Sequence, residues 1–202
     1  MLLEKYWKIE EKLFPKNFFY RHSKLVAPDL IGCYLIKKNN ETDQVKGIIV
    51  ETEAYSQEEE AWHGYNKKTE STKSLFGEPG TFYIYKSYGI HHCLNIVTDK
   101  ENFASGVLIR SVFISKKNER LASGPGLVTK AFNVDISFNS LEVLNNKSLW
   151  ISPRDSTLED KDLIQTTRIG IAKAKNIKWR WYLKNSRSVS KRLKGDRTPK
   201  FQ

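Results

Sequence analysis

Short segments of strand composition recur between residues 30 and 114, separated by turn-forming residues. Each is rich in β-branched and aromatic side chains, which favour strands. The segments are LIGCYLIKK at Leu30–Lys38, VKGIIVETEAY at Val45–Tyr55, TFYIYKSY at Thr81–Tyr88, HHCLNIV at His91–Val97 and SGVLIRSVFI at Ser105–Ile114. The polar NNETD between the first two predicts a hairpin. The pattern therefore predicts a sheet that is mostly antiparallel.

Helical patterns are fewer. Apolar spacing predicts a helix over Leu2–Phe14, ended by Pro15, and a short helix over Leu127–Phe132. Two further short strands are expected at Leu149–Ser152 and Arg168–Ala172. The chain contains no repeat and no linker, so residues 1–202 are expected to form a single α+β domain, with peripheral helices around the antiparallel sheet.

The composition of the 202 residues excludes several classes of protein. Hydrophobic residues make up 39% of the chain, which is enough for a core. No apolar run approaches the roughly 20 residues that a membrane span needs, and the N-terminal residues lack a cleavable apolar segment. Cys33 and Cys93 are the only cysteines, which excludes a disulfide framework. We expect a soluble protein of the cytoplasm, or of the nucleus in a eukaryote, that is not secreted and does not contact membranes.

Positive charge is concentrated near the C-terminus. The segment 172–202 contains eleven Lys and Arg residues against the single Asp196, which accounts for ten of the eleven net charges of the chain. Such a block favours phosphate backbones through counterion release, although it also keeps proteins in solution. Nucleic acid is therefore one candidate partner, and solubility alone is the alternative.

Two acids lie late in an otherwise apolar strand. Side chains alternate along a strand, so Glu51, Glu53 and Tyr55 are expected on one face. Acids are costly to bury unless they are paired or useful, and crowding raises the pKa of at least one carboxyl group. One of them is thus a candidate general base. The alternative is an edge strand on which both acids face water.

The aromatic segment raises a similar choice. Alternation places Tyr83 and Tyr85 on one face, with Tyr88 next to Gly89, where the chain is expected to turn. Aromatic residues are common in strands and pack cores, but three tyrosines in one strand also suit a surface on which bases stack. The polar segment 56–80 is long for a plain connection, so it is expected to be functional or disordered.

The histidines do not have the spacing of a metal site. His91 and His92 are adjacent in a predicted strand and point to opposite faces, and His63 is far from them in the sequence. Neither Cys-x-x-Cys nor His-x-x-x-His occurs. No metal ligand is predicted.

Several sequence blocks together resemble the alkyladenine (3-methyladenine) DNA glycosylases. They occur in that family's order from about Phe18 to Ser190, nearly the whole chain. The blocks are ETEAY, His63, EPGTFYIYKSYGIHHCLNIV, VLIR, SGPG, RIGI and WRWYL. The resemblance implies a compact domain with a curved sheet and a monofunctional enzyme of base-excision repair. Such an enzyme flips an alkylated purine out of DNA and hydrolyses its N-glycosidic bond, without a cofactor.

The resemblance also implies a role for each matched residue. Glu53, the second glutamate of ETEAY, is the catalytic residue that orients and deprotonates the attacking water. Tyr55 and His63 line one side of the base pocket and Tyr85 the other, and Asn95 lies beside the pocket.

Three further features of the chain are implied to meet DNA. Tyr88 is the wedge that fills the gap left by the flipped nucleotide, and Arg110 contacts the nucleotide and the water site. The basic segment, which includes Arg180, supplies phosphate contacts. The implied partner is damaged double-stranded DNA, bound by a monomer.

The chemistry of the lesions suits these residue types. A 3-methyladenine or 7-methylguanine is cationic, so its bond to the sugar is already weakened, and tyrosine faces attract the cation. Hypoxanthine and ethenoadenine are neutral and also need help for the departing base. Two alternatives remain open: a non-catalytic nucleic-acid-binding module, and a bifunctional lyase that uses Lys86 as nucleophile.

Overall fold

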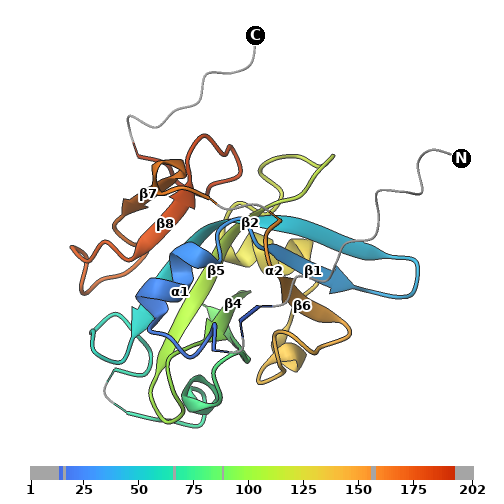
Figure 1. Ribbon diagram of the computed structural model, residues 1–202. Coiled ribbons are helices and arrows are strands. Elements are labelled where there is room, and N and C mark those ends of the chain that lie inside the picture. The colour runs from blue at the N-terminus through green and yellow to red at the C-terminus, as the bar shows by residue number, and fades with distance from the viewer. Residues whose placement is uncertain (1–13, 16, 66, 88, 156–157, 194–202) are drawn as a thin grey trace, which may run out of the picture.

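The computed structural model describes residues 14–15, 17–65, 67–87, 89–155 and 158–193 (Figure 1). Apart from its last residue, the helix expected over Leu2–Phe14 lies outside these residues, as does Tyr88.

An antiparallel sheet forms the centre of the described structure. It has eight strands, of which six follow the order β3-β4-β5-β2-β1-β6, while β8 pairs with β2 and β7. Every pairing is antiparallel, and the sheet curls around itself (Figure 1). The strands are β1 (Tyr34–Lys38), β2 (Gln44–Ser56), β3 (Phe82–Ser87), β4 (His91–Val97), β5 (Ser105–Phe113), β6 (Leu149–Ser152), β7 (Leu163–Thr166) and β8 (Arg180–Leu183).

Two short α-helices accompany the sheet. Helix α1 (Ser23–Asp29) packs against β2 and β5, and α2 (Pro125–Ala131) packs against β4 and β5. Short 3-10 helices η2, η3 and η4 lie at Lys73–Phe76, Ile136–Phe138 and Asp160–Asp162. None of the helices in the described ranges has the length and apolar character needed to cross a membrane. The α+β class and the curved sheet are thus confirmed.

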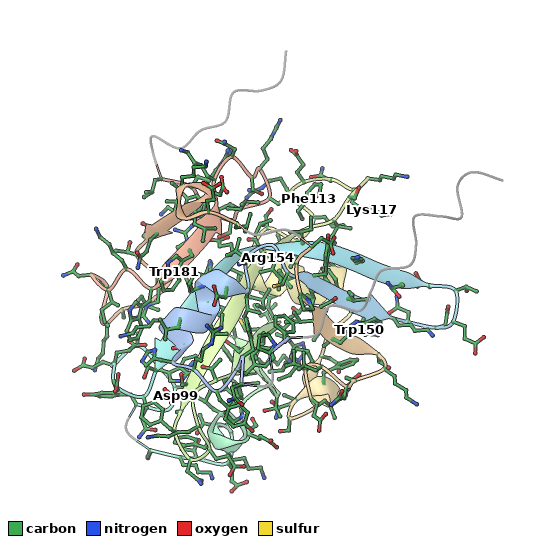
Figure 2. All side chains as sticks on the ribbon, viewed as in Figure 1. Asp99, Phe113, Lys117, Trp150, Arg154 and Trp181 are labelled. Atoms are coloured by element: carbon green, nitrogen blue, oxygen red, sulfur yellow. The ribbon has the colours of Figure 1, made fainter. Side chains whose placement is uncertain are left out.

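The core of the described residues divides into a large, mainly aliphatic cluster, a smaller aromatic one and a third, minor one. The aliphatic cluster lies between α1, α2 and the sheet, and Trp181 of β8 belongs to it (Figure 2). The aromatic cluster includes Tyr55, Trp62, Tyr83 and Leu108, which come from β2, β3, β5 and the segment after β2. Packing of that segment onto the sheet brings the expected site residues together.

Most of the expected strands are confirmed. The hairpin forms with Tyr34 opposite Ile48, although Leu30–Cys33 belong to the turns after α1 rather than to β1. The segments at His91–Val97 and Leu149–Ser152 form β4 and β6, and the expected helix at Leu127–Phe132 begins two residues earlier, at Pro125.

The strand expected at Arg168–Ala172 is wrong. These residues form an irregular loop, in which Gly170 has a φ of +77° and the Arg168 side chain is buried. RIGI has the composition of a strand. Its backbone takes an irregular path instead, because the side chain of Arg168 is held inside the protein. Strands β7 and β8 and helix α1 were not expected, since all three are short and polar residues interrupt their patterns.

The close approach of β2 to β5 at Gly47 leads us to predict that a side chain at this position destabilises the protein. A methyl group at Gly47 would lie 2.5 Å from Cγ1 of Val112 and 2.8 Å from the carbonyl oxygen of Phe113. Gly47→Ala should therefore lower the free energy of unfolding by about 1–3 kcal/mol through overpacking. The exposed control Gln44→Ala on the same strand should change it by less than about 0.5 kcal/mol, as measured by urea unfolding. Equal effects would contradict the proposed clash.

Candidate active site

Glu51 and Glu53 lie on the interior strand β2. Both side chains are fully buried, and β2 pairs at this point with β5 on one side and β8 on the other. The register of β2 against β5 shifts around Glu51, which marks a bulge or irregularity there. The alternative of an exposed edge strand is therefore wrong, and both acids need internal partners.

Three donors surround the Glu53 carboxylate. The Tyr55 hydroxyl donates to Oε2 at 2.8 Å, and Nη1 of Arg110 donates to the same oxygen at 3.2 Å. The backbone amide of Ile169 donates to Oε1 at 2.8 Å. Burial, followed by the nearby Glu53 charge, raises the pKa of Tyr55 well above its usual value, so this hydroxyl stays a donor. The donors come from β2, β5 and the loop after β7.

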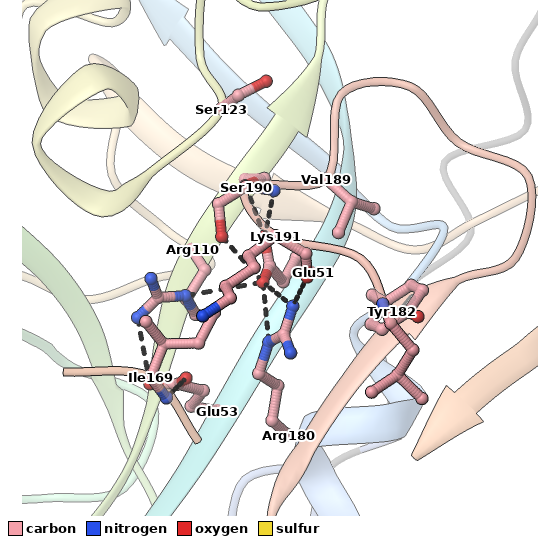
Figure 3. A network of polar contacts seen from close by, with 12 residues as sticks. Glu51, Glu53, Arg110, Ser123, Ile169, Arg180, Tyr182, Val189, Ser190 and Lys191 are labelled. Atoms are coloured by element: carbon pink, nitrogen blue, oxygen red, sulfur yellow. Dashed lines mark hydrogen bonds and ion pairs between the residues drawn. The ribbon is translucent and has the colours of Figure 1, made fainter. Parts of the chain in front are cut away.

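Glu51 has a different set of partners (Figure 3). Arg180 donates from Nε at 2.8 Å, the Ser111 hydroxyl donates at 2.7 Å, and Ser190 donates from its backbone amide at 2.7 Å and its hydroxyl at 2.9 Å. Burial alone would raise the pKa of Glu51, but the charges of Arg180 and Arg110 outweigh it, and the pKa is lowered. Nε of Arg110 lies 3.5 Å from Oε1 of Glu51. Crowding therefore does not raise the pKa of Glu51, because Arg110 contacts both acids.

A cavity of about 1210 Å³ opens beside this network. Its lining includes four of the expected site residues, Tyr55, His63, Tyr85 and Arg110, together with Ile169. All three donors to Glu53 therefore border the cavity, and the buried carboxylate lies behind them. The described part of the structure brings an acid, a guanidinium and aromatic rings together at one hollow.

The aromatic rings of the cavity contact one another. Tyr83 and Tyr85 stack with ring centroids 5.5 Å apart, which confirms that they share a face. The His63 ring meets Tyr85 edge-on at 4.4 Å, and Nδ1 of His63 lies 3.1 Å from the Tyr83 hydroxyl. Burial lowers the pKa of His63, so the imidazole is neutral at pH 7. The three rings therefore form an uncharged aromatic part of the cavity wall.

Tyr55 has neighbours at its ring as well as at its hydroxyl. Trp62 stacks on the ring with centroids 4.7 Å apart, and the Arg168 guanidinium lies over it at 4.6 Å. Both groups therefore lie over the Tyr55 ring. Tyr55 is thereby fixed by its face contacts while its hydroxyl points to Glu53.

Asn95 lies on the strand next to β3, directly opposite Tyr83. It is fully buried on β4, and its Nδ2 donates to the backbone oxygen of Tyr83 at 3.1 Å. Among the described residues, its Oδ1 has no hydrogen-bond partner. It lies next to the cavity wall but is not part of the lining.

The basic segment is partly internal. Arg180 is buried against Glu51 and also donates to the backbone oxygen of Lys191, which makes the expected phosphate contact wrong for Arg180. Lys173 lies 3.4 Å from Glu60 at the cavity. Within the described ranges, no group of three or more His, Cys, Asp or Glu residues is arranged to hold a metal ion.

Three elements of this site were missed by sequence reasoning. They are Trp62, Arg168 and the backbone amide of Ile169. Trp62 directly precedes His63, and Arg168 opens the RIGI block, so the first is adjacent to a residue that carried the resemblance and the second lies within such a block. A backbone amide has no signal in the sequence.

Comparison with known proteins identifies the class to which this protein belongs, a family of DNA glycosylases. The profile of the methylpurine-DNA glycosylase family matches residues 17–187, and the chain belongs to this family. It is therefore an enzyme of base-excision DNA repair that hydrolyses N-glycosyl bonds.

Three similar proteins carry the provisional name 3-methyladenine DNA glycosylase. The protein of Trichodesmium erythraeum is 39% identical, over 89% of this chain and 98% of its own length. That of Carboxydothermus hydrogenoformans is also 39% identical, over 89% and 100%. That of Methanoculleus marisnigri is 36% identical, over 88% and 98%. The similarity thus spans the whole length of these relatives.

The lowered pKa of Glu51 predicts how stability depends on pH. A carboxylate whose pKa is depressed by folding stabilises the protein above its unfolded pKa, near 4.5, and this contribution is lost as the pH falls through the folded value. Glu51→Gln should lower the free energy of unfolding by about 3 kcal/mol at pH 7, because it leaves Arg180 unpaired. The difference from the parent should shrink below about pH 4.5 in urea unfolding series. A difference independent of pH would contradict the ionic role of Glu51.

Proposed function

We propose that this protein removes alkylated purines from double-stranded DNA by flipping the nucleotide into the cavity and hydrolysing its N-glycosidic bond with a water activated by Glu53. The observation that carries the proposal is the Glu53 carboxylate, buried and held by three donors that all border one aromatic cavity. The family and its provisionally named relatives favour alkylated bases as substrates.

The contacts of Glu53 leave room for one more hydrogen bond. A carboxylate has about four acceptor sites. Two donors occupy Oε2 and one occupies Oε1, so Oε1 retains a site for the proton of a water. When the bond to the base breaks, C1′ of the sugar gains positive character, and the carboxylate stabilises it while orienting the water. Arg110 keeps the carboxylate in place while the bond to the base breaks and while the water attacks C1′.

The rings of the cavity support selection by charge. The neutral imidazole of His63 and the face of Tyr85 do not repel a cationic 3-methyladenine or 7-methylguanine, and a ring face attracts the cation. Tyr55 has two groups over its ring, Trp62 and the Arg168 guanidinium, and its hydroxyl donates to Glu53. We therefore assign the edge contact to Tyr55 and the stacking contact to Tyr85 and His63 of the cavity lining. Hypoxanthine and ethenoadenine would be weaker substrates, since they lack the charge.

Flipping requires compensation for lost stacking. Extrusion costs a few kcal/mol and is cheapest at a damaged pair. We propose Tyr88 as the wedge that fills the gap, Asn95 as a residue beside the base, and exposed lysines and arginines of the segment 172–202 as phosphate contacts. The enzyme would act as a monomer at the chromosome and without a cofactor.

The proposed role of Glu53 leads to a prediction about the rate of base release. Glu53→Gln keeps the shape of the side chain but cannot take a proton from water, so base release should fall by about a hundredfold to ten-thousandfold. The measurement is single-turnover release of 7-methylguanine from duplex DNA, followed by alkaline cleavage of the abasic site. Glu58→Gln is the matched control, because Glu58 is an exposed acid of the neighbouring segment.

Other outcomes would separate the alternatives. Parent protein that binds methylated duplex but releases no base would support the non-catalytic binding module. A covalent complex trapped by borohydride would support the lyase, for which Lys86 at the cavity lining is the candidate. Full activity of Glu53→Gln would contradict the proposed mechanism.

The proposed role of Tyr85 leads to a prediction about lesion selectivity. Tyr85→Leu removes the ring face, so it should reduce release of 7-methylguanine roughly thirtyfold, the equivalent of about 2 kcal/mol for a desolvated cation–π contact. Release of the neutral hypoxanthine should fall less, and Tyr85→Phe should retain most activity on both lesions. Equal losses on both lesions would contradict selection by charge.

A further inference from the structure

Arg168 and Glu59 form a buried ion pair beside the Glu53 site. Nη1 of Arg168 lies 2.7 Å from Oε1 of Glu59, and its Nη2 lies 2.8 Å from Oε2. The two side chains are 0% and 4% exposed. A two-point pair of this kind fixes orientation as well as distance. The pair joins the segment after β2 to the loop after β7.

The same guanidinium also contacts β2 next to the catalytic acid. Nη1 of Arg168 donates to the backbone oxygen of Ala54 at 3.0 Å, and Ala54 lies between Glu53 and Tyr55 in the sequence. The guanidinium covers the Tyr55 ring at 4.6 Å. One side chain therefore contacts the backbone that carries Glu53 and the ring whose hydroxyl donates to it.

The residue after Arg168 provides another donor. The Ile169 amide points to Oε1 of Glu53 at 2.8 Å, although its loop forms no strand and Gly170 has a φ of +77°. A loop without strand pairing needs another anchor to hold an amide in place. The Arg168 side chain, fixed to Glu59 and Ala54, provides that anchor.

We propose that the Arg168–Glu59 pair is a positioning device for Glu53, which holds the Ile169 amide and the Tyr55 hydroxyl on its carboxylate. This inference rests on the proposed function. Neither residue of the pair is assigned a contact with the base or the water, so both act through Glu53. A displacement of about 1 Å in such a site lowers the reaction rate by roughly a hundredfold.

Two conservative variants test the pair. Arg168→Lys keeps the charge but loses the two-point geometry, and Glu59→Gln keeps the shape but loses the charge. Each should lower the single-turnover rate of 7-methylguanine release by about tenfold to a hundredfold, with the Kd for lesion-containing duplex within about threefold of the parent. The pH dependence of the rate should also differ from that of the parent, because the hydrogen-bond donors around the Glu53 carboxylate are displaced.

Arg21→Lys is the matched control. Arg21 makes the same three kinds of contact away from the cavity: it pairs with Asp29 at 2.9 Å, donates to the backbone oxygen of Phe18 at 2.9 Å and covers the Phe18 ring at 4.6 Å. Its replacement should change thermal stability but neither the rate nor the pH profile. Rates are compared per folded molecule, at a temperature where circular dichroism shows each variant to be folded.

The outcomes separate the two proposals. If Arg168→Lys and Glu59→Gln both release base within threefold of the parent rate with an unchanged pH profile, while Glu53→Gln is inactive, the positioning role is overturned and the proposed function stands. The positioning role is also overturned, and the proposed function stands, if the Kd for lesion-containing duplex rises by as large a factor as the rate falls. If Glu53→Gln retains full activity, the proposed function itself fails.

Discussion

The structure depends on how a carboxylate can be buried in the middle of a sheet. An unpaired acid in such a place would be expelled or neutralised, so Glu53 requires donors from every side. Tyr55, Arg110 and the Ile169 amide supply them from β2, β5 and the loop after β7. Because the donors border the cavity while the acid lies behind them, the same contacts that permit burial also place the acid next to the cavity.

The two glutamates of ETEAY share a face but differ in their partners. Glu51 accepts hydrogen bonds from Arg180, Ser111 and Ser190, which attach β8 and the C-terminal part of the described chain to β2. Glu53 has fewer partners and retains an acceptor site. Arg110 contacts both acids and so links the partners of Glu51 to those of Glu53. Glu51 thus attaches elements of the fold to one another, and Glu53 is the acid to which we assign the proposed chemistry.

Much of this arrangement could be predicted from the sequence because it depends on strand alternation. Alternation placed Glu51 with Glu53 and Tyr83 with Tyr85, and the order of motifs indicated the family. The partners could not be predicted, since they come from long-range contacts: Arg168 lies 109 residues from Glu59, and the Ile169 amide lies 116 from Glu53. The charge of Arg180 suggested a DNA contact, whereas burial next to Glu51 decided its role. Local pattern says nothing about which charges meet inside the core.

The most direct measurement of the central claim is a crystal structure of the protein bound to duplex DNA that contains a hydrolysis-resistant alkylated nucleotide. The account predicts that the base lies in the cavity against Tyr85 and that an ordered water lies within about 3.2 Å of Glu53, facing C1′ of the sugar. A complex in which the base lies in the cavity but Glu53 remains sealed from both water and sugar would contradict it.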